Sequence, residues 1–537
     1  MSKRSKRLAG AAVLVMIGFV LSRVLGLVRE MVIGAAFGTS GALDAYRTAF
    51  LLPDILFTLF AGGALASAFI PTFTSYLARG DEESAWEVAS SVFNLAALAM
   101  TLAAGALFVA APWIVPWVVP GYGPAKQSLT IDLERIMLVS PVVFGLSGII
   151  MGVLNSYGRF ALPALAPAAY NAAIIGGAWL GMQLFPAEAQ AAQRAQLLAA
   201  SVSLGAGLHL VVQLPGLVRH KVPYRLVMRV WHPGVREVGR LMAPRVLGLG
   251  MTQLNFLVNN VLGSLLVEGS VAALGYAWLL MMMPLGVFAM AISTVVFPTM
   301  AELFATDRLD ELRGTLRRGL GLILYLTIPA SVGLVVLREP LVRLLFQRGE
   351  FTVTSTQMVA GALGFYALGL FAHATLEIAT RCFYALHDTW TPVLVGVGSV
   401  VVNIALSWVL LAPLSLGGLA LANSAATAGE ALLLLVLLSR RLHGIEGRAL
   451  ALSVLKSTAA SLAMGVLVAG WLWLTGPHLP TGPLAGSGQA LVGDGVPVIG
   501  GIVLGALAYA GLTWALRCEE TGSWLRVARN WRSGTSN

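Results

Sequence analysis

Long apolar runs recur along this 537-residue chain and dominate its pattern. A helix needs roughly 20 apolar residues to cross a bilayer, and a spanning segment must satisfy its own backbone hydrogen bonds, which favours helices. Only 11% of the residues are charged, whereas soluble domains carry about 25%. The mean hydropathy is +0.82. We therefore expect an all-α, polytopic membrane bundle.

The apolar runs predict 14 transmembrane helices when they are cut at charges and at Gly/Pro clusters. Their approximate limits are 8–36, 44–78, 86–111, 133–157, 163–185, 196–218, 239–266, 271–303, 318–338, 357–385, 391–411, 417–439, 454–475 and 496–516. No segment between them is long enough for a separate soluble domain.

Basic residues predict the orientation of these helices. With the amino terminus in the cytoplasm, 24 of the 35 Lys and Arg residues lie near cytoplasmic ends, six lie on the opposite side and five lie within spans. This bias follows the positive-inside rule. Both termini are therefore expected to be cytoplasmic. The net charge of +10 indicates contact with anionic membrane lipids rather than with nucleic acid.

Two segments resemble each other closely enough to suggest an internal duplication. GGALASAFIPTFTSYLARGDEE and GVFAMAISTVVFPTMAELFATDRLDE each place small residues before a proline (Pro71 and Pro298) and an acidic loop after it. Repeated halves are common in transporters, and the substrate site then lies between them. We expect two pseudo-symmetric six-helix lobes, a basic cytoplasmic linker and two further helices with a basic tail, at 1–218, 239–442, 219–238 and 443–537.

Two arginines, Arg23 and Arg29, lie inside the first apolar run. An arginine near the centre of a membrane helix costs at least ~2.5 kcal/mol on insertion scales. A polar cavity that receives an anion would remove this cost, and the guanidinium fork suits bidentate binding of phosphate. The alternative is that the side chains extend to the membrane interface, which applies more readily to Arg29 than to Arg23.

Further charges follow in the first two spans. Arg23 and Glu30 are seven residues apart and share a helix face, and Asp44 and Arg47 stand at i and i+3. Asp44 either pairs with Arg47 or closes a gate by pairing with an arginine of the first span. Arg245 in span 7 is either a cavity residue or an interfacial anchor. The candidate cavity residues are Arg23, Arg29, Asp44, Arg47 and Arg245.

A second polar face lies in span 10, where His373, Glu377 and Arg381 repeat every four residues. Glu before Arg at i+4 is the favourable order for a helix ion pair. A structural pair is therefore favoured over a proton relay. Glu30, Glu377 and Arg381 are the candidates for a gate or a structural ion pair.

The sequence contains no motif that we associate with catalysis. It has no HExxH, no Walker loop and no paired-aspartate magnesium motif, and Cys382 and Cys518 are too isolated to suggest a zinc site. We expect a protein that is not an enzyme and has no metal or other cofactor.

The order of several motifs identifies a family resemblance. SRVLGLVREMVIGAAFG, DAYRTAF, LPDILFTLFAGGALASAFIPTF, LNSYGRFALPALAPAAYN, QLPGL, MMMPLGVFAMAISTVVFPTM, LFQRGEFT and FYALHDTWTPV follow one another along nearly the whole chain. In this respect the chain resembles the MviN/MurJ proteins of the multidrug/oligosaccharidyl-lipid/polysaccharide exporter superfamily.

This resemblance implies a flippase that moves lipid II, the undecaprenyl-diphosphate-linked disaccharide-pentapeptide, across the bacterial plasma (inner) membrane by alternating access. It implies two lobes around a central cavity and a groove for the lipid tail at helices 13 and 14. It also implies Arg23, Arg29 and Asp44 as site residues. The cell-wall synthesis machinery is a further partner that it suggests.

The chain departs from the family pattern at positions that usually carry charge. Family arginines near Phe57 or Thr58 are absent, a family glutamate is replaced by Gly62, and Leu279 stands where helix 8 usually has arginine. Fewer cations would hold a diphosphate less firmly, so another polyprenyl-diphosphate-linked glycan is the alternative substrate. Arg47 and Arg245 are the residues that could compensate.

Other classes of membrane protein fit less well. A drug exporter for cationic compounds would favour an acidic cavity, whereas the first lobe is basic. A channel would need no duplicated lobes with cations between them, and a membrane glycosyltransferase would need metal-binding carboxylates or a soluble domain.

Overall fold

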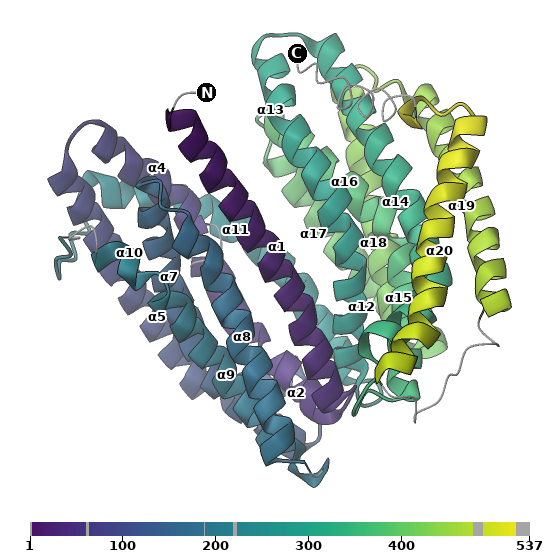
Figure 1. Cartoon of the computed structure of the whole chain (residues 1–537). Helices are drawn as coiled ribbons and strands as arrows, with labels where there is room; N and C mark the ends of the chain where they lie inside the picture. The colour runs from purple at the N-terminus through teal and green to yellow at the C-terminus, as the bar shows by residue number, and fades with distance from the viewer. Residues whose placement is uncertain (1–2, 61–63, 187, 219–222, 476–486, 522–537) are drawn as a thin grey trace. The chain divides into compact units, whose positions relative to one another are not determined.

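The computed structural model describes residues 3–60, 64–186, 188–218, 223–475 and 487–521 of the chain, and side chains within them except at 3–14, 19, 64–67, 188, 243–252 and 487–492. Every regular element in these ranges is a helix (Figure 1). The prediction of an all-α fold is therefore confirmed.

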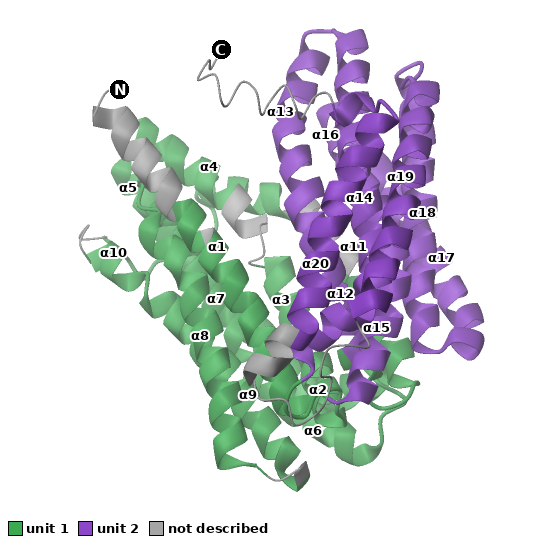
Figure 2. Cartoon of the chain, turned by 45° about the vertical axis from the view of Figure 1, so that its right-hand side comes forward, with its two compact units in different colours: residues 1–272, 348–351 green, residues 273–347, 352–537 purple. Residues whose placement is uncertain are grey.

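The chain divides into two compact units, residues 1–272 with 348–351 and residues 273–347 with 352–537 (Figure 2). The first unit contains α1 (Lys3–Phe37), α2 (Gly41–Ala49), α3 (Leu51–Phe60), α4 (Ala64–Ala78), α5 (Glu82–Val118), α6 (Pro124–Met137), α7 (Val139–Ser156), α8 (Ala161–Leu184), the 3-10 turn η1 (Glu188–Gln190), α9 (Ala191–Val211), α10 (Leu214–Val218) and α11 (Pro233–Ser264).

The unit boundary falls within α12 (Ser270–Pro284), whose first turn belongs to unit 1. Unit 2 continues with the π-helical turn η2 (Leu285–Met290), α13 (Ala291–Ala305), α14 (Leu309–Phe346), α15 (Val353–Leu368), α16 (Leu370–Ala385), α17 (Trp390–Leu414), α18 (Leu416–Arg441), α19 (Gly447–Thr475) and α20 (Ser487–Ala515). The two compact units are not the two predicted lobes, which are divided at the 219–238 linker. The division into lobes stays a prediction.

Helix length and composition agree with a multi-pass membrane protein. Within the described residues, ten helices or continuous helix pairs are long and apolar enough to cross a membrane, and the bent pair α15–α16 raises the number to 11. The other three predicted spans fall on α1, on α2–α4 and on α11. Each of the 14 predicted spans thus has a helical counterpart, and the number of crossings itself stays a prediction.

The second predicted span is not one helix but the three helices α2, α3 and α4. The Ser40 hydroxyl caps α2 by accepting a hydrogen bond from Leu43 N at 3.4 Å, as N-cap serines do. Pro53 lies in the first turn of α3, where its missing N–H costs no helical hydrogen bond. The break at Phe50 changes the course of the chain, so side chains of both α2 and α3 face the same part of unit 1.

Close helix packing in unit 1 uses small residues. α1, α8 and α9 run side by side (Figure 1), and a Cβ at Gly18 would lie 2.8 Å from Ala164 Cβ. Small residues allow such approaches between membrane helices. Elsewhere in unit 1, Phe69, Phe73 and Trp86 form a buried core between α4, α5 and α7.

The described part of the predicted basic linker lies along α5. Tyr224 donates a hydrogen bond from its hydroxyl to Asn94 Oδ1 at 2.7 Å, and Asn94 Nδ2 donates to the Val227 carbonyl at 2.9 Å. Arg229 pairs with Glu87 at 2.5 Å. Residues 224–229 are therefore fixed to unit 1 by side chains of α5.

Unit 2 contains a sharp bend of 46° between α15 and α16. Gly369 joins the two helices, and a Cβ at this position would lie 2.5 Å from Ser424 Oγ. The Ser424 hydroxyl donates to the Phe365 carbonyl at 2.9 Å. This bond satisfies a carbonyl that a continuous helix would pair with the amide of residue 369.

Candidate functional site

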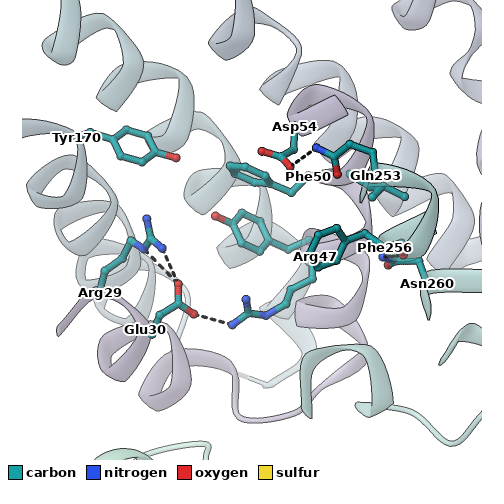
Figure 3. A pocket seen from close by; sticks show the side chains of 11 residues that line it. Arg29, Glu30, Arg47, Phe50, Asp54, Tyr170, Gln253, Phe256 and Asn260 are labelled. Carbon is teal, nitrogen blue, oxygen red and sulfur yellow. Dashed lines mark hydrogen bonds and ion pairs between the residues drawn. The ribbon is translucent and has the colours of Figure 1, made fainter. Parts of the chain in front are cut away.

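One cavity of about 260 Å³ lies within unit 1 (Figure 3). Helices α1, α2, α3, α8 and α11 and the residue between α2 and α3 supply its lining: Arg29, Glu30, Tyr46, Arg47, Phe50, Leu51, Asp54, Tyr170, Gln253, Phe256 and Asn260. The cavity has room for a small anionic group such as a diphosphate.

A carboxylate between two guanidinium groups forms one end of this cavity (Figure 3). Glu30 Oε1 pairs with Arg29 Nη2 at 2.8 Å, and Glu30 Oε2 pairs with Arg47 Nη2 at 2.6 Å. Glu30 is 5% exposed. The three side chains carry a net charge of +1, and each oxygen of the carboxylate occupies a position where an oxygen of a bound anion could be held.

Arg29 is oriented by a third partner. Its Nη1 donates to Asn171 Oδ1 at 3.1 Å, and Asn171 Nδ2 donates to the Pro167 carbonyl at 3.0 Å. Asn171 lies on α8, the helix packed along α1. The Arg29 guanidinium therefore binds Glu30 through Nη2 and Asn171 through Nη1. A lysine ammonium would not reproduce this geometry.

Asp54 and Gln253 form the opposite end of the cavity (Figure 3). Gln253 Nε2 donates to Asp54 Oδ2 at 3.1 Å and to Thr58 Oγ1 at 2.9 Å. Gln253, Phe256 and Asn260 follow one another on α11 at spacings of three and four residues, which places them on one helix face. Polar and aromatic groups of α11 thus meet the charged groups of α2 and α3.

Asp44 lies outside this cavity and has a different set of partners. Its carboxylate accepts hydrogen bonds from Lys126 Nζ at 2.9 Å, from Gly269 N at 2.7 Å and from Ala272 N at 2.8 Å. The two amides belong to the first turn of α12 and the residue before it, so the carboxylate caps that helix and faces its positive dipole end. Asp44 is 1% exposed.

The remaining candidate residues have separate positions. Arg23 is exposed on α1 and does not belong to the cavity lining, and the side chain of Arg245 lies outside the described residues. In unit 2, Arg381 pairs with Glu377 at 2.6 Å, and its Nη1 donates to Thr294 Oγ1 at 3.2 Å. The structure thus brings together Arg29, Glu30 and Arg47 of the predicted set.

The positions where the chain lacks the charged residues of the family pattern have different surroundings from one another. Phe57 packs edge to face on Phe144, with ring centroids 5.6 Å apart, and Thr58 takes part in the Gln253 contact. Leu279 is half-buried in α12, and Gly62 lies outside the described residues.

Sequence reasoning missed Gln253, Asn171 and Lys126 as polar partners of these charges. Gln253 and Asn260 gave a usable signal, since they are polar residues seven apart in a membrane helix. Within the described residues, no three His, Cys, Asp or Glu side chains lie close enough to hold a metal ion, and both cysteines are buried and free.

The fold is shared with a known membrane transporter. A multidrug resistance transporter of the MATE family in the MOP superfamily, solved in an inward-facing conformation, superposes with a TM-score of 0.66 at 14% identity, covering 81% of this chain and 99% of that one. At this identity the likeness concerns the fold alone.

The family is shown by closer matches. The profile of the family described as lipid II flippase MurJ matches residues 33–481. A probable lipid II flippase MurJ from Rhizobium meliloti is 32% identical over 489 residues, covering 88% of both chains. Its counterpart from Vibrio cholerae is 32% identical over 452 residues, covering 82% of this chain and 83% of its own. This chain belongs to the lipid II flippase MurJ family.

A solved structure supports the same relationship. A lipid II flippase MurJ in an inward closed conformation has a TM-score of 0.76 and 25% identity, with 94% of this chain and 98% of that chain covered. The match extends across nearly all of both chains.

Proposed function

We propose that this protein is a lipid II flippase and that Arg29, Glu30 and Arg47 bind the diphosphate of its substrate. Membership of the family supports the activity. The observation that supports the site is the Glu30 carboxylate held between two guanidinium groups at 2.8 and 2.6 Å. Arginine forks bind phosphate and carboxylate in the same bidentate manner.

The cluster suggests an exchange of anions during transport. In the absence of substrate, Glu30 neutralises part of the charge of Arg29 and Arg47, which lowers the cost of holding two cations in a membrane protein. A diphosphate displaces the carboxylate by supplying more negative charge and more acceptor oxygens. When the substrate leaves, Glu30 again pairs with both arginines. The carboxylate then opposes rebinding of the released diphosphate.

Transport requires the site to open alternately to the two leaflets. The predicted lobes at 1–218 and 239–442, joined by the linker at 219–238, supply the two bodies for such a movement, and the segment 443–537 supplies two further helices and the tail. We assign a role in this cycle to the three other candidate cavity residues, Arg23, Arg245 and Asp44. Asp44 acts through its contacts at the start of α12.

The family and the distribution of basic residues together suggest the cellular setting. We place the protein in the bacterial inner membrane with both termini in the cytoplasm, where its basic loops contact anionic lipids. Lipid II flipped to the outer leaflet would there be available to the cell-wall synthesis machinery. The proposed step translocates the substrate without changing its covalent bonds.

Complementation provides the test. A bacterial strain depleted of its own lipid II flippase should grow when it expresses this protein, and growth should fail with Arg47→Ala at equal membrane abundance. If the wild-type protein is inserted but does not support growth, lipid II is not its substrate. Transport of another polyprenyl-diphosphate-linked glycan is then the alternative to assay.

A further inference from the structure

The end of the cavity opposite the arginines contains a hydrogen-bond acceptor with no partner. Gln253 is 7% exposed, lines the cavity, and its Oε1 is buried without a hydrogen-bond partner among the described residues. A buried amide oxygen left without a donor destabilises the protein, because it has lost its hydrogen bonds to water. Such an atom at a cavity wall is a candidate for contact with a ligand.

The orientation of the Gln253 amide is determined by its neighbours. Asp54 Oδ2 lies 3.1 Å from Gln253 Nε2, and Thr58 Oγ1 lies 2.9 Å from the same nitrogen. An ionised carboxylate only accepts hydrogen bonds, so the NH₂ group has to face Asp54. The carbonyl oxygen of Gln253 is therefore the atom left to meet a donor from the cavity.

Asp54 adds a negative charge to this end of the cavity. No described cation forms an ion pair with Asp54, whereas Glu30 at the other end pairs with two arginines. A carboxylate that is removed from water without a countercharge is costly. A cationic donor group would relieve this cost and would also satisfy Gln253 Oε1.

We propose that Asp54 and Gln253 form a subsite for an ammonium group on the sugar–peptide head of the substrate. This inference rests on the proposed function. An ammonium has three donors and no acceptor, which suits a carboxylate beside an amide oxygen. A metal ion such as Ca²⁺ takes six to eight oxygen ligands, more than these two side chains supply.

The two ends of the cavity then recognise different parts of one molecule. The arginine cluster has an excess of positive charge and takes the diphosphate, and the Asp54–Gln253 subsite takes a positive group of the head. Thr58 contributes by holding the Gln253 amide in place, so it is a positioning residue. A head group with both charges would be distinguished from a lipid diphosphate alone.

Paired probes test the subsite. Full-length protein in nanodiscs is titrated with lipid II whose peptide carries a lysine, and with the same lipid II after acetylation of that lysine amine. We expect the wild-type protein to bind the free amine at least five-fold more tightly. Asp54→Asn should remove this preference, and Gln253→Met should reduce it while retaining the Asp54 charge.

Two controls separate this inference from the proposed function. Asp310→Asn changes an exposed carboxylate at the start of α14 and should leave the preference intact. Undecaprenyl diphosphate without a head group measures how far Asp54→Asn changes the affinity for the diphosphate itself, and this change affects both lipid II probes equally, so the ratio between them reports the subsite. Equal binding of both lipid II probes to wild type, or a preference that persists in Asp54→Asn, overturns the subsite. If neither probe binds to wild type, the proposed function itself fails.

Discussion

Glu30 is predicted to limit the affinity of the cavity for a diphosphate. In Glu30→Gln, the side chain keeps its size but loses the negative charge that pairs with Arg29 and Arg47 at 2.8 and 2.6 Å. A bound diphosphate would no longer compete with the carboxylate or be repelled by it. We therefore expect tighter binding of the substrate anion.

The expected magnitude follows from Coulomb's law. Two anions that share a guanidinium are roughly 6 Å apart, and at an effective dielectric constant of about 20 their repulsion is about 3 kcal/mol. Solvent and salt reduce this value, because the arginine side chains are 26% and 23% exposed. An increase in affinity of about ten-fold, or roughly 1.4 kcal/mol, is the expected result.

The assay measures binding of undecaprenyl diphosphate to purified protein in nanodiscs at low and high salt. Glu377→Gln is the matched control, since Glu377 also pairs with an arginine at 2.6 Å but lies in unit 2 outside the cavity. This control should bind like wild type. Unchanged or weaker binding by folded Glu30→Gln would refute the competition between Glu30 and the substrate.

Three further predictions concern stability, measured as thermal unfolding in detergent. Asp44→Asn should lower the free energy of unfolding by about 2–4 kcal/mol, because a buried carboxylate with three donors is lost; a wild-type melting temperature would contradict this. Gly369→Ala should destabilise the protein, whereas Gly361→Ala, whose Cβ meets nothing within 4 Å, should not, and equal melting temperatures would count against the bend. Burial opposes ionisation of Asp388, but hydrogen bonds from the next helix and from Arg441 outweigh it and hold the pKa of this carboxyl below its ordinary value. Its contribution is therefore complete above about pH 5 and lost as the pH falls through the lowered pKa, so wild type should lose stability on acidification more steeply than Asp388→Asn.

Apolar runs, cut at charges and at Gly/Pro clusters, predicted the helical class and the positions of the helices. Membrane helices must be long and apolar, so their limits can be read from composition along the chain. The break at Gly369 could not be predicted in this way, because it depends on Ser424, which is 55 positions later in the sequence. Local patterns do not report which distant side chain will replace a missing helical hydrogen bond.

The cost of placing charges in a membrane indicated the site only in part. It directed attention to Arg29, Glu30 and Arg47, which the structure brings into direct contact. It did not indicate the cap that Asp44 forms at the start of α12, since those amides are more than 220 residues away in sequence. The Asp54–Gln253 contact was missed for the same reason.

Flipping by purified protein tests the central claim most directly. Proteoliposomes that contain fluorescent lipid II on one leaflet would be prepared with wild type and with Arg29→Ala, Arg47→Ala and Arg381→Ala at equal protein content. We predict that wild type and Arg381→Ala move lipid II, and that loss of either Arg29 or Arg47 lowers the rate at least ten-fold. Wild-type rates in both Arg29→Ala and Arg47→Ala would contradict the assignment of the diphosphate to this cluster.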